Sequence, residues 1–241
     1  MSHPLGGALR RVDRANRHIH QAQELQRAFA SSCENQLITH HDLESGQVHC
    51  WVDGRIPVPV PDDFPLAVSD AIHNLRAALD YLIYELALLD SKMEQEGTQF
   101  PIFTCKLGVS PKGKKYGFDI KAPQFLRGLT LDHIAAIERL QPYNGGDWLE
   151  TLHQISNPDK HRRLTTISAS VDDTIVITRG DVRTDHNGVL IPDPNPHREV
   201  HADYAILIGL PNGPVPLVPT LQRIESQVRR VIQSFKSEFK I

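Results

Sequence analysis

Two short segments of this chain bring histidine, basic and acidic side chains within one or two helical turns of one another. The first segment runs from Asp70 to Asp80 inside a helical pattern and contains His73 and Arg76. At about 100 degrees per residue, His73, Arg76 and Asp80 are expected within about 60 degrees of one another, together with Tyr84. An arginine beside a titratable histidine suits binding of a phosphate or carboxylate, or proton transfer. We therefore take His73, Arg76 and Asp80 as candidate catalytic residues.

The second segment reads Asn-Pro-Asp-Lys-His-Arg and covers residues 157–162. Pro158 lacks an amide hydrogen and disfavours a helical conformation at Asn157, so the preceding helix is expected to end or kink there. Asn157 would then cap a new short helix, whose free amides attract anions. The densest group of cations in the chain follows at once. The predicted anion-binding residues are Asn157, Lys160 and Arg162, and His161 joins the candidate catalytic residues.

Other interpretations of the same residues stay open. Arg76 and Asp80 also suit an internal ion pair that joins their helix to a neighbour, which would make the chain a non-catalytic helical module for binding or dimerisation. A metal site is a third interpretation, but no HExxH-type spacing supports it, so we predict no metal and no cofactor. Its candidate ligands are His73, His153, Asp159 and His161.

The composition is that of an ordinary globular protein. Of the 241 residues, 40% are hydrophobic and 23% are charged, and the net charge of -3 favours no class of partner by itself. No apolar run approaches the ~20 residues of a membrane helix, and the N-terminal arginines lead into no apolar signal core. The three cysteines are widely spaced and form no CxxC pair. We therefore expect a cytoplasmic protein without a membrane anchor.

Apolar periodicity predicts one domain over residues 1–241. Apolar residues recur at three- and four-residue spacing in the segments that form the predicted helical core. Helices and strands do not alternate along the chain, which favours an α+β fold, a bundle of about five helices with an attached antiparallel β-sheet. The helical core is predicted from residues 5–33, 62–90, 130–163 and 220–239, and the strands from residues 36–52 and 164–209.

Three regions between the main helices have predictions of their own. Residues 91–121 are rich in Gly, Lys and Pro, and we expect a long excursion that is anchored by the apolar residues Phe100–Phe103. Thr130 is expected to cap the helix that follows. In the second strand region, an Asp-Asp turn is expected to separate the strands Leu164–Ala169 and Thr174–Thr178.

The first predicted helix has a basic stripe. Arg10, Arg14 and Arg17 lie on one side of it, and such a stripe can neutralise the phosphates of a nucleic acid. A solvated helix face is the simpler interpretation in a mildly acidic chain.

Five ordered blocks of the sequence resemble a widespread family of uncharacterised bacterial proteins, with the match spanning roughly residues 8–165. Two of the blocks are Leu75-Arg-Ala-Ala-Leu-Asp80 and Asn157-Pro-Asp-Lys-His-Arg162. The others begin at Arg11, Gln99 and Leu140. This resemblance implies relatives and no activity.

A looser resemblance is to HEPN ribonucleases, which are helical dimers that cut RNA without a metal at an Arg-x4-6-His motif. Arg76 and four further residues are followed by Tyr81, so the histidine of that motif is missing. The resemblance implies RNA or a phosphorylated ligand as the partner, and a homodimer. In such an enzyme, His161 or His73 would act as acid or base while Arg76 and Lys160 stabilise the phosphate transition state.

Overall fold

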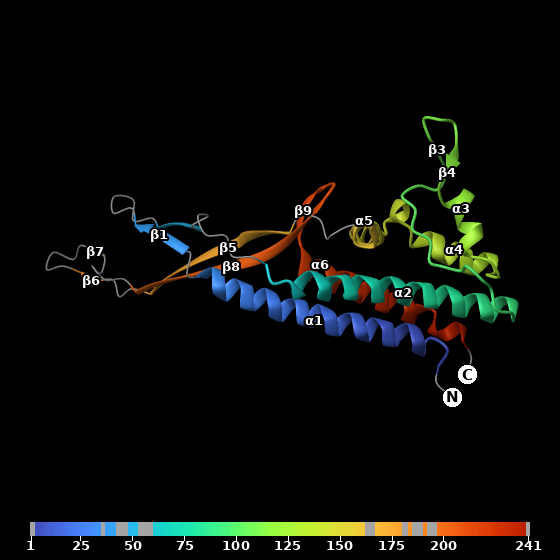
Figure 1. The fold of residues 1–241 in the computed structure, drawn as a ribbon, viewed down its shortest axis with the longest axis horizontal. Helices are drawn as coiled ribbons and strands as arrows, with labels where there is room; N and C mark the ends of the chain where they lie inside the picture. Colours follow the sequence, from blue (N-terminus) through green and yellow to red (C-terminus); the bar gives the residue numbers. More distant parts are fainter. Residues whose placement is uncertain are drawn as a thin grey trace.

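The structure of the chain is a computed structural model. It describes the backbone of residues 3–34, 37–41, 48–52, 60–161, 167–179, 183–184, 190–191 and 197–239, and the side chains of residues 3–32, 60–156 and 206–239. These residues form the predicted α+β fold, a helical bundle with small antiparallel sheets (Figure 1). The α-helices are α1 (Gly6–Glu34), α2 (Asp63–Ser91), α3 (Phe118–Phe125), α4 (Leu131–Arg139), α5 (Asp147–His161) and α6 (Leu217–Ser234). The strands are β1 (Leu37–His41), β2 (Val48–Val52), β3 (Gly108–Val109), β4 (Lys115–Tyr116), β5 (Ile167–Arg179), β6 (Arg183–Thr184), β7 (Leu190–Ile191), β8 (His197–Leu210) and β9 (Gly213–Pro216).

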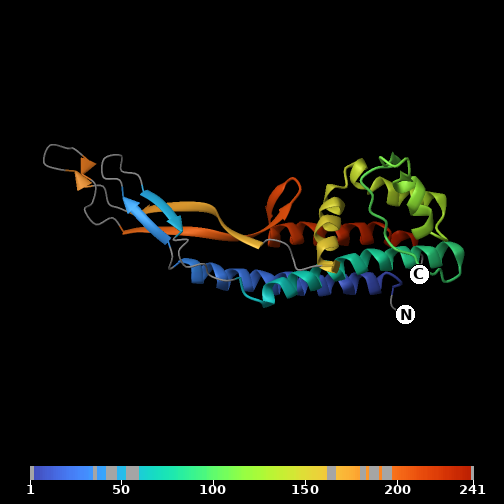
Figure 2. The ribbon, with the colours of Figure 1, turned by 45° about the horizontal axis from the view of Figure 1, so that its top comes forward.

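Three long helices, α1, α2 and α6, lie side by side and enclose much of the core (Figures 1 and 2). Each has apolar residues at three- and four-residue spacing and therefore one continuous face to bury. Their positions confirm the helices predicted at 5–33, 62–90 and 220–239, although α6 begins at Leu217 and ends at Ser234, so both of its ends come earlier than predicted. None of the helices in the described ranges is apolar enough over a sufficient length to cross a membrane. Buried residues of the three helices include Val12, Ile19, Leu75, Leu79, Leu82, Ile224, Val228 and Ile232.

Strands occur in both predicted regions, but β3, β4 and β9 lie outside them, and one predicted turn is wrong. β1 and β2 pair as an antiparallel hairpin, and β5, β8 and β9 form a three-stranded antiparallel sheet. The expected turn at Asp172 and Asp173 is wrong, because β5 is one strand with a bulge between Val171 and Asp173. A bulge absorbs an extra residue without ending the ladder, so Asp172 is left out of the pairing, Asp173 pairs with Asp203, and the chain does not reverse.

The excursion after α2 ends in a helix that the sequence analysis did not predict. Phe100 is buried, which confirms the apolar anchor expected at Phe100–Phe103. α3 begins within the last residues of the excursion and buries Phe118 and Ala122, which are four residues apart on one face. Its brevity and the internal Pro123 hide this helical spacing in the sequence.

α5 corrects the prediction for the second charged segment. The helix continues through Pro158 to His161, so Asn157 lies inside it and is not the N-cap of a new helix. Pro158 removes one amide donor, but it lies close to the end of α5, and the turn around it stays helical. The helix N-terminus on which we based anion binding by Asn157, Lys160 and Arg162 is therefore not formed.

Candidate functional site

Arg76 and Asp80 lie one turn apart on α2 and hold the backbone of Phe100 between them. The Nη2 atom of Arg76 donates to the carbonyl oxygen of Phe100 over 3.2 Å. The backbone N–H of Phe100 donates to Oδ1 of Asp80 over 2.9 Å. The two side chains themselves approach to 3.9 Å between Nη2 and Oδ1. The pair predicted from the sequence is thus present, and it fastens the excursion to α2.

The guanidinium of Arg76 is incompletely neutralised by these contacts. Its side chain is 15% exposed, and its Nη1 atom is buried without a hydrogen-bond partner. Burial lowers the pKa of Arg76, and the carboxylate of Asp80 offsets part of this effect. Arginine is stabilised best by a short, two-pronged contact with an anion, which a separation of 3.9 Å does not provide. Nη1 of Arg76 is therefore a buried donor that lacks an acceptor.

A pocket of about 250 Å³ lies beside Arg76. One wall comes from the segment Gln99–Phe103 and from Phe125, and another comes from α5, which contributes His153 and Ser156. The hydroxyl of Ser156 donates to the carbonyl oxygen of His153 over 3.1 Å. Helices far apart in the sequence, α2 and α5, therefore meet at one polar pocket just before residues 157–162 begin.

His73 is not part of this pocket. It is exposed, and within the described residues it makes no hydrogen bond or ion pair with Arg76 or Asp80. Tyr84, the fourth member of the predicted group, donates instead to Glu94 over 3.2 Å. The expected meeting of all four side chains is therefore wrong, because positions within about 60 degrees on a helix can still point to different neighbours. The catalytic role of His73 stays a prediction.

The other predicted site residues lie at the end of α5 or beyond it. Asn157, Lys160 and His161 belong to the last turns of α5, and Arg162 follows the helix. Their side chains lie outside the described residues, so the roles of Asn157, Lys160 and Arg162 in anion binding and of His161 in catalysis stay predictions. From the sequence, His153 was a candidate metal ligand only. It lies one helical turn before Asn157, and this spacing is the signal that could have placed it at the site.

Gln141 supports the pocket wall, and no pattern in the sequence indicates this role. Its side chain is fully buried between η1 (Pro142–Asn144) and the excursion. Its Oε1 atom accepts the backbone N–H of Phe103 over 2.9 Å, and its Nε2 atom donates to the carbonyl oxygen of Pro101 over 3.0 Å. The residues that line the pocket are thus fixed from α2 on one side and by Gln141 on the other.

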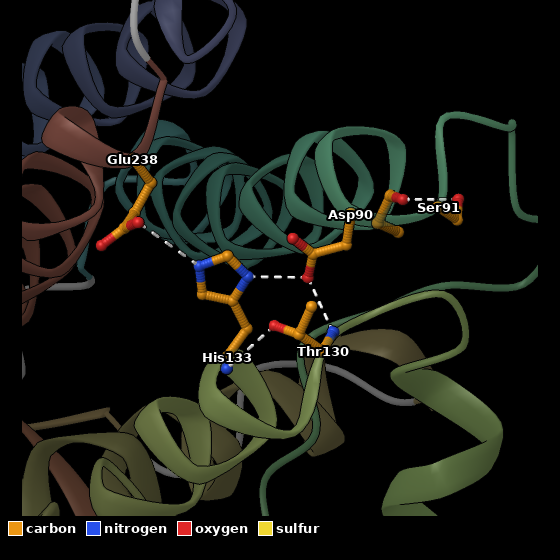
Figure 3. A network of polar contacts seen from close by, with 6 residues as sticks. Asp90, Ser91, Thr130, His133 and Glu238 are labelled. Atoms are coloured by element: carbon orange, nitrogen blue, oxygen red, sulfur yellow. Dashed lines mark hydrogen bonds and ion pairs between the residues drawn. The ribbon is translucent and has the colours of Figure 1, made fainter.

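A second polar cluster joins α2, α4 and the C-terminal turn η2 (Lys236–Glu238) (Figure 3). The Nδ1 atom of His133 lies 2.7 Å from Oδ2 of Asp90, and the same oxygen accepts the backbone N–H of Thr130 over 2.7 Å. An ionised carboxylate only accepts, so Nδ1 of His133 carries the hydrogen. Thr130 also caps α4, as predicted, because its hydroxyl accepts the backbone N–H of His133 over 3.4 Å.

This second cluster holds elements together and does not form a catalytic triad. The Nε2 atom of His133 faces the carboxylate of Glu238, 4.0 Å away, and not a hydroxyl or thiol nucleophile. Burial alone raises the pKa of Asp90, but the hydrogen bonds from Thr130 and His133 outweigh burial and hold the pKa below its usual value. Asp90 is thus stabilised as a carboxylate.

Compared with protein-family models, curated proteins and solved structures, the chain gives no significant match. The resemblances to a bacterial family and to HEPN ribonucleases therefore stay predictions. The case for a function depends on the pocket beside Arg76.

Proposed function

We propose that the chain binds a phosphate group, carried by a nucleotide or another small phosphorylated ligand, in the pocket beside Arg76. One observation carries the proposal: Arg76 lines the pocket, and its buried Nη1 atom has no acceptor. A phosphate oxygen would supply that acceptor and balance the charge that Asp80 leaves uncompensated. His153 and Ser156 add polar groups on the wall formed by α5.

The size of the pocket restricts the ligand. Its volume of about 250 Å³ is below the range of roughly 300–1,000 Å³ that is usual for pockets holding drug-sized molecules. The pocket is therefore large enough for a phosphate group and too small for a whole nucleotide, whose base would lie outside it. A carboxylate offers similar chemistry to arginine, so the test includes one.

Isothermal titration calorimetry with inorganic phosphate, AMP and acetate tests the proposal. We expect phosphate and AMP to bind at one site and acetate to bind more weakly. Arg76→Lys keeps the charge but loses the planar fork, so phosphate affinity should fall by about tenfold or more. Asp80→Asn removes a negative charge near the guanidinium and keeps an oxygen that can accept from Phe100, so affinity should rise several-fold.

Arg229→Lys is the matched control, because this arginine is already paired with Asp13 and Glu225 at 2.9 and 2.7 Å. Its phosphate affinity should equal that of the wild type. Tighter binding of acetate than of phosphate would contradict the proposal. So would an affinity that neither Arg76→Lys nor Asp80→Asn changes, since the guanidinium and its neighbouring carboxylate would then lie outside the binding site.

The alternative prediction, a non-catalytic helical module with structural ion pairs, is favoured by the contacts of Arg76 and Asp80 with Phe100. On that interpretation, Arg76→Lys lowers the melting temperature and the wild-type protein shows no heat of phosphate binding. Calorimetry and a thermal melt on the same samples separate the two functions.

Cleavage of RNA is a separate prediction, which requires catalysis in addition to phosphate binding. A metal-independent ribonuclease that uses His73, Arg76, Asp80 and His161 would cut RNA in the presence of EDTA, and its His161→Ala variant would not. Equal cleavage by the two proteins, or none by either, would retire the ribonuclease prediction and leave the phosphate site standing.

A further inference from the structure

α1 carries a row of arginines away from the Arg76 pocket. Arg10, Arg14 and Arg17 are exposed, and their spacing of four and then three residues places them on one stripe of the helix. At 1.5 Å per residue the row is about 10 Å long. It borders an open groove of about 430 Å³, which we call the arginine groove. The residues that line the groove are Gly7, Arg10, Arg11, Arg14, Arg17 and Tyr81.

The exposed arginines of this row have no counter-charge in the described part of the chain. Arg10, Arg14 and Arg17 make no hydrogen bond or ion pair there. Asp13, on the same helix, is bound by Arg229 of α6 at 2.9 Å. Most surface arginines gain little from an ion pair, but several unpaired ones along a groove create a local positive potential that attracts a polyanion. This charge is local, because the whole chain has a net charge of -3.

Tyr81 of α2 gives the groove an aromatic surface. The residue is 41% exposed, and the guanidinium carbon of Arg11 lies 5.5 Å from the ring centre. Arg11 is itself held by the side-chain oxygen of Asn74, at 3.4 Å from its Nη1 atom. Gly7 lets the ring approach α1, since a Cβ atom at this position would lie 3.1 Å from Cδ1 of Tyr81. The ring is thus fixed against α1 and still accessible.

We propose that the arginine groove binds single-stranded nucleic acid, with backbone phosphates on Arg10, Arg14 and Arg17 and a base against Tyr81. Arginines that follow a backbone and an aromatic ring that stacks on a base together characterise binding without sequence preference. In a duplex the bases already stack on one another, so a duplex would gain the phosphate contacts but not the contact with Tyr81. The inference goes beyond the phosphate pocket and does not rest on it.

Fluorescence anisotropy with labelled oligonucleotides of about 12 nucleotides, as RNA and as DNA, tests the inference. A plot of the logarithm of affinity against the logarithm of salt concentration should have a slope of about -2 to -3. Each neutralised phosphate of a single strand contributes about -0.7 to this slope. The double variant Arg14→Gln/Arg17→Gln should bind more weakly and reduce the slope by about 1.4. Tyr81→Leu should weaken binding about tenfold with the slope unchanged.

Arg27→Gln is the matched control, because Arg27 is on the same helix but is paired with Glu24 at 2.6 Å. It should leave the affinity and the slope unchanged. An effect of Arg27→Gln as large as that of the double variant would overturn the inference, as would the absence of oligonucleotide binding. Tighter binding of polyglutamate than of RNA and DNA would assign the groove to an acidic protein partner and would also overturn it.

The two proposals can fail separately. Arg76→Lys should leave oligonucleotide affinity unchanged, and Arg14→Gln/Arg17→Gln should leave the calorimetric affinity for inorganic phosphate unchanged. If Arg76→Lys lost oligonucleotide binding and still melted like the wild type, the oligonucleotide would bind at the pocket beside Arg76. This result would overturn the assignment to the arginine groove.

Discussion

The backbone of Phe100 is held from both sides by α2, with its N–H on Asp80 and its carbonyl oxygen on Arg76. This contact explains why a basic and an acidic side chain occur one turn apart beside an apolar face. It uses only one nitrogen of the guanidinium, and the buried Nη1 atom is left without a partner. A buried donor without an acceptor costs about 1–3 kcal/mol, so the same arginine that fixes the excursion would be stabilised by the anion that we propose.

At the residue scale, Asp90 makes stability depend on pH. Its pKa in the folded chain lies below its usual value of 3.8, so its contribution to stability is present above about pH 4 and is lost as the pH falls through the folded pKa. Asp90→Asn should lower the free energy of unfolding by about 2 kcal/mol near neutral pH, or about 4–8 °C in melting temperature. The difference between wild type and variant should shrink as the pH falls from about 4 to about 2. A constant difference across this range would show that Asp90 is not stabilised as a carboxylate.

Single residues differ in how much of their role the sequence reveals. Arg76 was identifiable because a lone arginine in an apolar stretch needs a specific partner. His73, three residues away on the same helix, is exposed, and periodicity cannot tell which edge of a polar stripe meets another element. The structural role of Gln141 could not be predicted, because its buried contacts are with the backbone of a segment distant in the sequence.

At the scale of elements, the segment Gln99–Phe103 is the part of the excursion that forms the pocket wall. Gln141→Leu would leave the N–H of Phe103 and the carbonyl oxygen of Pro101 buried without partners. We expect a loss of about 2–4 kcal/mol in the free energy of unfolding, measured by urea denaturation. The same substitution at the exposed residue Gln124 of α3 is the control and should change little. A Gln141→Leu variant as stable as the control would refute the role assigned to this side chain.

The long elements were predictable and the short ones were not. α1, α2 and α6 bury a repeated apolar face, and that repetition is visible over many turns. α3 has too few residues to show a period, and the bulge in β5 depends on its pairing with β8, which the sequence does not contain. Pro158 shows the limit of a local rule, because α5 continues through it.

At the scale of the whole molecule, α2 is the common element of both proposed sites. The Arg76 pocket lies between α2, the excursion and α5, and the arginine groove lies between α2 and α1. Figures 1 and 2 show α1 and α2 side by side along the bundle, with α5 running across its direction. The fold thus has a small pocket beside Arg76 and a separate open groove along α1, and these are the places where we propose a phosphate and a longer anion.

The position of phosphate in a crystal structure of the protein with phosphate bound tests the central claim most directly. We predict a phosphate oxygen within about 3.2 Å of Nη1 of Arg76, with the contacts of Arg76 and Asp80 to Phe100 retained. A phosphate bound elsewhere on the chain, with Nη1 of Arg76 still lacking an acceptor, would contradict the claim.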